Sequence, residues 1–505
     1  MELKKHQATA QNDEDLASLV VHFTPKEVLQ HPRYKKWIEE FSPSTHHLIL
    51  NECSTCMGSQ SVHRIQYKLN MLSEDMFPLL GDKGTQLVNE ASSIHVNKKQ
   101  KCEATSYGNC TQTDLNLSNL SVESRPTSPS EPYIFPNTFC SYHLRPKKGL
   151  DRTCELRINP KEYISETMSI DDFADTLQEL HRDLSQSRKR LSIREYPKIL
   201  FLGTGSCIPN KTRNTSGILL TLSETQNVLL DCGEGTYGQI VRFFGQEAAD
   251  RVLSNIDCVY ISHLHADHHI GLVGLLQGRR RALDNLKLNK EPLYLFARSR
   301  FWLGSASTTD ILNNPTLPQS EKQKILEKLG MMDINTCLVR HCPNAFGVAL
   351  TDKHGHKITY SGDTMPSDNL VELGISSDVL IHEATMEDEL AHEAITKMHS
   401  TTSPSDRNRE KNGKPRIFCL PTSARGMRSC PDLTTIFLIM LVSPSITCRM
   451  DELPLVPKLY PSLRLMFAEH YEELEHKAVK RQLKIERQRE ASLTRNKEKL
   501  EQATQ

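Results

Sequence analysis

Hydrophobic and polar positions divide this chain into folded regions joined by a polar segment. Residues 1–90 carry apolar runs at Leu19–Phe23 and His47–Leu50 together with amphipathic helical patterns. Residues 91–139 are dominated by Ser, Thr, Asn and Pro, and we predict a disordered linker because this composition buries too little surface to fold. Apolar periodicity returns over residues 140–195, which we assign to the same amino-terminal region as residues 1–90.

Residues 196–465 alternate short β-rich runs, glycine turns and helical segments. This alternation is typical of a layered α/β domain, with strands predicted at Lys198–Leu202 and Ile256–Ile261. The periodicity is lost over residues 404–449. The last residues, 466–505, are rich in Glu, Lys, Arg and Gln, and they predict a charged helical tail.

The composition restricts the classes of partner. Lys and Arg together number 62, as do Asp and Glu, so no global field attracts nucleic acid and any such binding needs a local basic patch. The chain opens on polar residues without the apolar core of a signal peptide, and no apolar run reaches the roughly 18 residues that span a bilayer. We therefore expect an intracellular protein with no membrane partner, whose 14 cysteines are reduced.

The stretch Ser262–His269 is the most informative part of the sequence, because it places four histidines and one aspartate directly behind a predicted strand. Neutral imidazole and carboxylate groups suit zinc and related divalent ions. Their alternation lets one short loop present ligands to two adjacent metals. A catalytic two-metal centre is the leading interpretation, and a His-rich surface loop or an adventitious metal binder is the alternative.

Further ligands are expected at His341 and Asp363, each of which follows a strand-like run. An aspartate at the glycine turn Ser361–Thr364 can bridge two metals held about 3.5–4 Å apart, so that a shared hydroxide faces the scissile bond. Either residue alone would be read as an ordinary core histidine or turn aspartate. Their order after the His-rich stretch favours metal ligation.

Four flanking motifs narrow the interpretation. They are the Pro-x-Lys-x-Arg-Asn loop Pro209–Asn214, the Asp motif Leu229–Thr236, the His-Glu-Ala-Thr motif His382–Thr385 and the His-Ser-Thr motif His399–Thr401. Together with the His-rich stretch they resemble tRNase Z, the endoribonuclease that trims the 3′ trailer from precursor tRNA. The resemblance covers roughly residues 195–403 and implies a metallo-β-lactamase fold, an αββα sandwich. Residues 1–90 and 140–195 resemble part of the degenerate, metal-free metallo-β-lactamase-like region that precedes it in the long form.

The resemblance implies two zinc ions and no small-molecule cofactor. One zinc ion would be bound by His263, His265 and His341. The second would be bound by Asp267 and His268, with Asp363 bridging the pair. The same likeness implies that Asp267 orients the attacking hydroxide as a general base.

The resemblance also implies roles for residues around the metals. His399, positioned by Glu383, would protonate the leaving 3′ oxygen. Lys211 and Arg213 would contact phosphates of the precursor tRNA partner. Three further residues are expected to support the site structurally, namely Asp231, His269 and His382. The family's long forms occur in the nucleus and in mitochondria, and a homodimer is left open.

The sequence departs from the family at one metal ligand. The family has a histidine, in His-Phe-Ser-Gln-Arg-Tyr, at a place that falls here on Pro421, and no histidine occurs between His399 and His470. The codons of Pro421–Arg428, read from the third base of the proline codon, are able to encode His-Phe-Ser-Gln-Arg-Tyr-Ala. Our hypothesis is that residues 404–449 are a frame-shifted reading.

Two other functions compete with an active endoribonuclease. A chain without its last metal-ligand histidine could bind tRNA or another partner without cleaving it. A small-molecule metallo-hydrolase on the same fold would share the His-rich loop, but it would have no use for Lys211 and Arg213.

Overall fold

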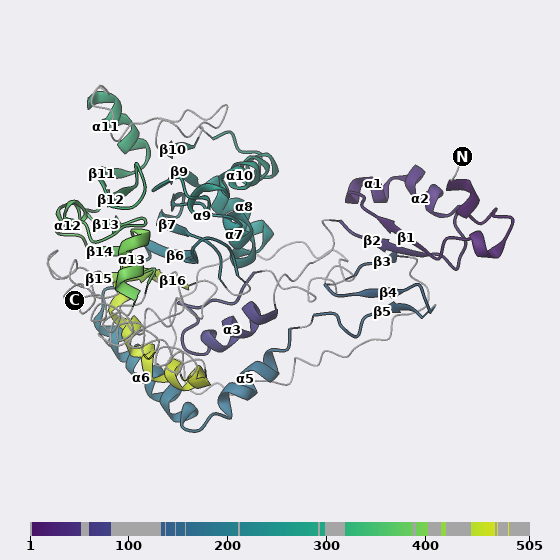
Figure 1. Cartoon of the computed structure of the whole chain (residues 1–505), viewed down its shortest axis with the longest axis horizontal. Helices are drawn as coiled ribbons and strands as arrows, with labels where there is room; N and C mark the ends of the chain where they lie inside the picture. Colours follow the sequence, from purple (N-terminus) through teal and green to yellow (C-terminus); the bar gives the residue numbers. More distant parts are fainter. Residues whose placement is uncertain are drawn as a thin grey trace, which may run out of the picture. The chain divides into compact units, whose positions relative to one another are not determined.

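The computed structural model of this chain divides into two compact units. The first comprises Met1–Gly58 and Lys83–Ile158, and the second comprises Ser59–Asp82 and Asn159–Gln505. Figure 1 draws and labels the elements of both. The structure describes residues 3–51, 60–81, 133–136, 138–146, 148–156, 158–210, 213–290, 293–297, 319–386, 390–401, 416–420, 446–469, 472 and 483.

The first unit is built on a three-stranded parallel sheet. Its order is β1 (Leu19–His22), β2 (His46–Ile49) and β3 (Tyr133–Ile134). Parallel neighbours require a crossover, and two helices supply it between β1 and β2, namely α1 (Lys26–Gln30) and α2 (Pro32–Ile38).

An apolar cluster fixes the helices of the first unit on its sheet. It is formed by Leu29, Ile38 and Ile49, with Tyr34, Trp37, Tyr133 and Phe135 packed around it. Three further elements complete the described part of this unit. They are the 3-10 helices η1 (Leu3–His6) and η2 (Asp13–Asp15) and an antiparallel hairpin of β4 (Ser141–His143) and β5 (Gly149–Asp151).

Two buried histidines lie on neighbouring strands of the first unit. Nε2 of His22 is 2.9 Å from Nδ1 of His47, and Nδ1 of His22 is 2.9 Å from the hydroxyl of Tyr34. Burial lowers the pKa of His22 to about 4, and the neighbouring His47 adds to the shift. Burial also lowers the pKa of His47. Both rings are therefore neutral at neutral pH.

The second unit contains a six-stranded and a five-stranded sheet. The six-stranded sheet has the spatial order β10 (Tyr294–Phe296), β9 (Ile256–Tyr260), β8 (Gln226–Leu230), β7 (Gly217–Ser223), β6 (Lys198–Gly203) and β16 (Ile446–Arg449). The five-stranded sheet has the order β11 (Met331–Leu338), β12 (Phe346–Asp352), β13 (Lys357–Tyr360), β14 (Val379–Glu383) and β15 (Arg416–Leu420). Both sheets mix parallel and antiparallel pairs.

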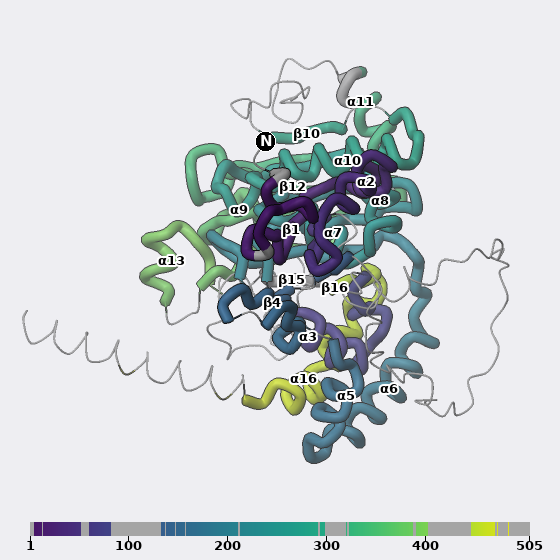
Figure 2. Tube along the Cα trace, turned by 90° about the vertical axis from the view of Figure 1, so that its right-hand side faces the viewer, coloured from purple at the N-terminus to yellow at the C-terminus, as the bar shows by residue number. Residues whose placement is uncertain are grey.

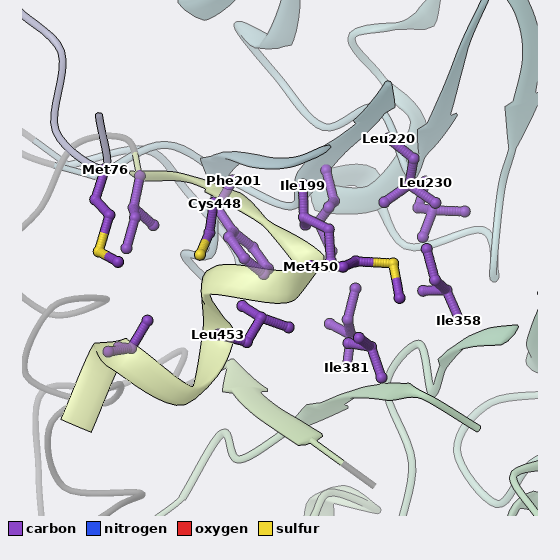
Figure 3. Packing of buried hydrophobic residues seen from close by; sticks show 14 of the residues in the cluster. Met76, Ile199, Phe201, Leu220, Leu230, Ile358, Ile381, Cys448, Met450 and Leu453 are labelled. Carbon is purple, nitrogen blue, oxygen red and sulfur yellow. The ribbon is translucent and has the colours of Figure 1, made fainter. Parts of the chain in front are cut away.

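One face of each sheet contributes to a shared apolar core. Successive side chains of a strand point to opposite faces, so alternate residues such as Ile199 and Leu220 reach the core from the six-stranded sheet. Ile358 and Ile381 reach it from the five-stranded sheet. Figure 3 shows these side chains close together, with Met450 between them. The two sheets are therefore packed face to face.

Helices cover the outer faces. On the six-stranded sheet, Leu200 and Leu219 share a second core with Ile240, Leu253 and Leu275. The last three belong to α7 (Thr236–Phe244), α8 (Gln246–Ser254) and α10 (Leu272–Leu286). On the other sheet, α12 (Asp368–Leu373) contributes Leu370 to a cluster with Val339 and Ala345. The layers thus run helix, sheet, sheet, helix.

Segments distant in sequence complete the second unit. Among the described residues, its remaining helices are α3 (Gln60–Asn70), α5 (Pro160–Met168), α6 (Phe173–Arg190), α9 (Ala266–His269), α11 (Gln319–Lys328), α13 (Ala391–Lys397), η5 (Met450–Leu459) and α16 (Tyr460–Met466). α6 contacts α16, and both helices, which Figure 2 labels, contribute to the core between the sheets. The backbone N–H of Thr447 donates to the carbonyl of Met76, and that of Gly81 donates to the carbonyl of Phe243. Residues 60–81 are thereby fastened to the sandwich.

The layered α/β arrangement that the pattern predicts for residues 196–465 is present. Within residues 404–449, the described parts are the two strands β15 and β16. Most of the predicted linker, residues 91–139, and of the predicted tail, residues 466–505, lies outside the described residues. The frame-shift hypothesis and the domain boundaries stay predictions.

The buried histidine pair predicts that the first unit weakens in mild acid. The unfolded chain takes up protons at these residues below a pKa of about 6.5, whereas folded His22 resists protonation down to about 4. The free energy of unfolding of the first unit should therefore be unaffected by these histidines above pH 6.5. It should decrease as the pH falls from 6.5 toward 4. Hydrogen exchange of the full chain, corrected for its intrinsic rate, should show protection of the β1 and β2 amides falling across this range.

A His22→Gln variant supplies the control, because its side chain still forms hydrogen bonds but does not titrate. Its β1 and β2 amides should show a smaller fall in protection with pH. An unchanged pH dependence in this variant would contradict the assignment of the effect to His22.

Candidate metal centre

The His-rich loop begins where β9 ends and runs into the short helix α9. His265 directly precedes the helix, and Asp267 and His268 lie on it. The loop packs tightly against the segment after β8. A Cβ atom on Gly271 would lie 2.0 Å from the carbonyl oxygen of Gly233, so only glycine fits at this contact. The close approach brings the ligand loop against the end of β8.

Two more predicted ligands follow strands of the five-stranded sheet. His341 comes three residues after the end of β11, and Asp363 comes three residues after the end of β13. Gly362 has a φ of +58°, a left-handed conformation that favours glycine, and it turns the chain just before Asp363. The N–H of Phe346 donates to the carbonyl of Ser262 at 3.0 Å, which ties the ligand loop to this second sheet.

Three imidazoles converge at this edge of the sandwich. Nε2 of His263 and Nε2 of His341 each lie 3.0 Å from Nδ1 of His265. The second ring nitrogen of two of these residues is already engaged. Nδ1 of His263 is 3.0 Å from Oγ of Ser262, and Nδ1 of His341 is 2.8 Å from the carbonyl oxygen of Met398. These contacts fix the rings with their other nitrogens facing one another.

Asp363 lies between this trio and His268. Its Oδ2 is 3.9 Å from Nε2 of His263 and 3.9 Å from Nε2 of His341. The same oxygen is 3.3 Å from Nε2 of His268. Asp363 is therefore placed as a bridge between two groups of donors.

Asp267 completes the second group from the side of the ligand loop. Its Oδ2 lies 3.8 Å from Nε2 of His268 and accepts a hydrogen bond of 2.7 Å from the backbone N–H of Cys207. Cys207 follows β6, so the loop that contains the Pro-x-Lys-x-Arg-Asn motif is anchored to this carboxylate. Asp267 is buried.

Asp231 is completely buried beneath the site and accepts four hydrogen bonds. Nδ1 of His268 donates to its Oδ2 at 2.7 Å. The backbone N–H and the hydroxyl of Ser262 donate to its two oxygens at 2.7 and 2.8 Å. The hydroxyl of Tyr360, from the opposite sheet, donates at 2.6 Å. Asp231 orients His268 rather than facing the converging donors itself.

A second buried carboxylate, Glu383, holds His399. Oε1 of Glu383 is 2.9 Å from Nδ1 of His399 and also accepts from the backbone N–H of Thr364 at 2.8 Å. Nδ1 of His399 lies 3.9 Å from Oδ2 of Asp363. The ring therefore stands beside the bridging carboxylate with one nitrogen fixed by Glu383.

The cluster shifts the pKa values of its members in different directions. Burial, reinforced by the nearby His268, lowers the pKa of His263 to about 2, so this imidazole is neutral. Burial would lower the pKa of His268, but the carboxylates of Asp363 and Asp231 raise it. Burial would raise the pKa of Asp363, but the facing histidines, His268 first, lower it. Burial would also lower the pKa of His399, and the hydrogen bond to Glu383 raises it instead.

The residues present fit a divalent metal. Neutral imidazole nitrogens and carboxylate oxygens are the donors that zinc takes. Sets of donor atoms lying within 4.8 Å of one another occur in three overlapping groups, namely His263, His265, His341 and Cys342; His263, His268 and Asp363; and His341, Asp363 and His399. A metal-binding histidine usually donates its other ring N–H to a carboxylate or carbonyl, as His268 and His341 are placed to do here.

The remaining predicted site residues do not belong to the cluster of donors described above. Arg213 is buried, and burial lowers its pKa to about 10. Lys211 lies outside the described residues. His269 is only partly exposed, with Nδ1 2.8 Å from the carbonyl of His265. His382 is completely buried, with Nδ1 2.6 Å from the carbonyl of Glu383. Their predicted roles stay predictions.

Sequence reasoning missed the groups that orient the candidate ligands. The sequence pattern predicts no role for Ser262, which lies in the His-rich loop, or for Tyr360, which precedes the glycine turn. Met398 contributes its backbone carbonyl, for which side-chain identity gives no signal.

Comparisons with known proteins agree with this geometry. A family model described as anti-Pycsar protein Apyc1 matches residues 197–408. Ribonuclease Z, mitochondrial, of Drosophila melanogaster is 41% identical over 499 residues, covering 94% of this chain and 62% of that protein. Zinc phosphodiesterase ELAC protein 2 of Rattus norvegicus is 36% identical over 494 residues, covering 93% of this chain and 55% of that protein. The chain thus spans little more than half the length of these relatives.

A solved structure extends the comparison to the fold. The crystal structure of a long form RNase Z from yeast aligns with a TM-score of 0.57 and 18% identity, covering 89% of this chain and 68% of that one. Together with the paired sheets and the histidine cluster, this defines a protein of the metallo-β-lactamase fold, as the sequence predicted. By sequence, the chain is similar to ribonuclease Z, mitochondrial, of Drosophila melanogaster and to zinc phosphodiesterase ELAC protein 2 of Rattus norvegicus.

Among the helices of the described residues, none is both long enough and apolar enough to span a membrane.

Tyr360 provides a test of the support beneath the metal centre. A Tyr360→Phe variant leaves the buried Asp231 carboxylate with one donor fewer. The free energy of unfolding should fall by about 1–3 kcal/mol. Zinc affinity, measured by competition with a chromophoric chelator, should fall roughly 10- to 100-fold because the support of His268 is weakened.

Tyr260→Phe is the matched control. Tyr260 is also buried, and its hydroxyl donates to the carbonyl of Phe346 at 2.8 Å rather than to Asp231. This variant should be destabilised to a similar degree while keeping its zinc affinity. Equal losses of zinc affinity in both variants would show that Tyr360 acts only through general stability.

Proposed function

We propose that this chain is a zinc-dependent endoribonuclease that removes the 3′ trailer from precursor tRNA. The observation that carries the proposal is the convergence of four histidines and two aspartates, from the loop after β9 and from the ends of β11 and β13, on one cluster in which all but His265 are buried. Support also comes from homologues named ribonuclease Z and zinc phosphodiesterase.

We assign His263, His265 and His341 to one zinc ion, and Asp267 and His268 to a second, with Asp363 shared. The 3.9 Å distances from Oδ2 of Asp363 to His263 and His341, and its 3.3 Å distance to His268, support the shared role. Two zinc ions would supply a water of lowered pKa and would neutralise charge that develops on the phosphate.

Two side chains of the protein would transfer the protons of the reaction. Asp267, whose carboxylate is held by the N–H of Cys207, is suited to orient the attacking water and accept its proton. His399 is suited to protonate the leaving 3′ oxygen through Nε2, because Glu383 already holds Nδ1. The raised pKa of His399 favours the protonated ring that a general acid requires.

We propose that the loop around residues 209–214 contacts phosphates of the tRNA. Two hydrogen bonds close this loop, because the N–H of Asn210 donates to the carbonyl of Arg213 at 2.9 Å and Oδ1 of Asn210 accepts from the N–H of Arg213 at 2.8 Å. Lys211 lies between these residues in sequence and would reach the phosphate. Arg213 stays charged near neutral pH even though burial lowers its pKa to about 10, and it would add to the field of the loop.

A mitochondrial location is proposed from relatives. The Drosophila protein is named ribonuclease Z, mitochondrial, and a relative from Arabidopsis thaliana is named tRNAse Z TRZ4, mitochondrial. A nuclear location and a homodimer stay predictions from the sequence.

Cleavage of a labelled precursor tRNA by the zinc-loaded full chain tests the function. Release of the 3′ trailer should occur with zinc and stop when a chelator removes it. Asp363→Asn should abolish cleavage, and His399→Asn should lower kcat by about 10²- to 10⁴-fold with little change in KM. His354→Asn, in an exposed turn, is the control and should cleave normally. Cleavage that persists in Asp363→Asn would overturn the proposal.

The second candidate function, binding of tRNA without cleavage, is favoured by Pro421. This proline stands where the family has a histidine ligand, and no other histidine lies between His399 and His470. The chain with Pro421 should then bind about one zinc ion tightly. Replacing residues 421–427 by His-Phe-Ser-Gln-Arg-Tyr-Ala should add a second tight zinc ion and raise the cleavage rate. The zinc content of both proteins is measured by elemental analysis after dialysis. Two zinc ions retained by each protein would contradict the proposal of a binding protein that does not cleave.

A further inference from the structure

A cavity of about 730 Å³ lies in the second unit, away from the candidate metal centre. It is lined by the starts of β6 and β8 and by the turn that joins β7 to β8. β7 is antiparallel to β6 and to β8, and β8 is parallel to β9, so β6, β8 and β9 all run in one direction. The ligand loop follows the end of β9, and the cavity is therefore at the opposite edge of the six-stranded sheet.

The cavity has the size and lining of a small-molecule site. Ligand pockets in proteins enclose roughly 300–1,000 Å³ and are mostly apolar, with a few polar groups that orient the ligand. Here the outer helices contribute Phe244 at the end of α7, Val252 on α8 and Leu286 at the end of α10. The ring of Phe244 packs edge to face on that of Phe243, with centroids 4.8 Å apart, so one wall is aromatic and held in place.

The side chain of Asn227 lines this cavity and is only 3% exposed. Its Nδ2 donates to the carbonyl of Val252 at 3.1 Å, and its backbone N–H donates to the carbonyl of Asn255 at 2.8 Å. Its Oδ1 has no hydrogen-bond partner among the described residues. A buried acceptor without a donor is costly, so this oxygen marks a place for an N–H or O–H group from outside the protein.

A guanidinium group lies in the exposed part of the lining. Arg251 of α8 forms no side-chain hydrogen bond or ion pair within the part of the chain that the structure describes. The other two cations of the lining, Lys198 and Arg449, both pair with Glu195. Arg251 is therefore the cation that is available to an anionic group in the cavity.

Three carboxylates of the lining restrict where such an anion can lie. Asp75 and Glu452 each form an ion pair with Arg188. Glu224 is exposed at the turn between β7 and β8, and it would repel an anion on that side. The favourable position for a negative charge is thus beside α8.

We propose that this cavity binds a nucleotide whose base carries an amino group. The flat base packs on the aromatic and aliphatic wall, as bases do on aromatic side chains. Its amino group donates to Oδ1 of Asn227, and its phosphate pairs with Arg251, whose guanidinium suits bidentate contact with phosphate. The site uses no residue of the candidate metal centre, so it does not depend on the proposed function.

An ordered water that donates to Asn227 is the alternative explanation for the unpaired oxygen. Buried waters commonly satisfy such groups. A water would leave the cavity without any preference between bases that differ only in a donor group. The preference between two such nucleotides therefore distinguishes the explanations.

Calorimetric titration of the full chain with adenosine monophosphate tests the proposal, with zinc present and again with a chelator. Adenosine monophosphate should bind with a Kd below about 1 mM in both conditions. Inosine monophosphate has a carbonyl oxygen in place of the amino group, and it should bind roughly 10-fold more weakly. Asn227→Ala should remove this difference. The carbonyl of Val252 keeps a donor in this variant, because the N–H of Asn255 also donates to it at 3.1 Å.

Two further variants test the other contacts. Arg251→Gln should weaken binding of adenosine monophosphate roughly 10-fold, because it loses the charged partner of the phosphate. Arg280→Gln is the matched control and should bind normally, since Arg280 is exposed, pairs with Asp284 and does not line the cavity. Leu288→Trp enlarges a side chain that lines the cavity and is 44% exposed, so it should block binding.

The opposing outcomes are distinct. No binding by the unaltered chain, equal affinity for the two nucleotides, or unchanged binding in Leu288→Trp would overturn the proposal. Binding that requires zinc would place the nucleotide at the metal centre and would overturn it as well. Thermal unfolding identifies any variant that misfolds, and if Asn227→Ala does so, Arg251→Gln and Leu288→Trp decide the result.

Discussion

The buried carboxylate of Asp231 is the interaction on which the fold and the site both depend. A completely buried charge is costly unless hydrogen bonds satisfy it, and Asp231 has four donors. Ser262 supplies two of them at the start of the ligand loop, His268 supplies the third, and Tyr360 supplies the fourth from the opposite sheet. The charge is satisfied only when the two sheets are packed together and the loop is in place. The same carboxylate consequently joins the two sheets and orients the candidate ligand His268.

Much of the candidate centre could be predicted because its donors are chemically distinctive and follow strands. His263, His341 and Asp363 are separated in sequence, yet each lies at the same edge of the sandwich, as the motif order suggested. The orienting groups could not be predicted. Tyr360 is 129 residues from Asp231, and Met398 acts through a backbone carbonyl, so their contacts exist only in three dimensions. The burial of Arg213 could not be predicted either, because an arginine in a polar loop is expected at the surface.

The strands of the fold can likewise be predicted from the sequence pattern, whereas the packing partners of its helices cannot. The continuous apolar runs of β6, β7 and β8 indicate strands with two apolar faces, and the two cores of the second unit confirm it. The helical pattern of α3 shows one apolar face but does not identify the surface that covers it. In the structure, Leu69 of α3 joins the core that lies between the sheets. Which distant segment fills that place depends on shape and chain connectivity, which a local pattern does not contain.

The loop after α13 links two functions that are usually considered apart. Met398, in a left-handed conformation with φ of 58°, gives its carbonyl to the ring of His341, and the next residue is His399, the candidate proton donor. The N–H of His399 is itself fastened to the carbonyl of Ala394 at 2.8 Å. Any shift of this short segment moves a candidate zinc ligand and the candidate acid together. A substitution that moves this segment would therefore change the environment of the candidate acid and of the candidate ligand at once.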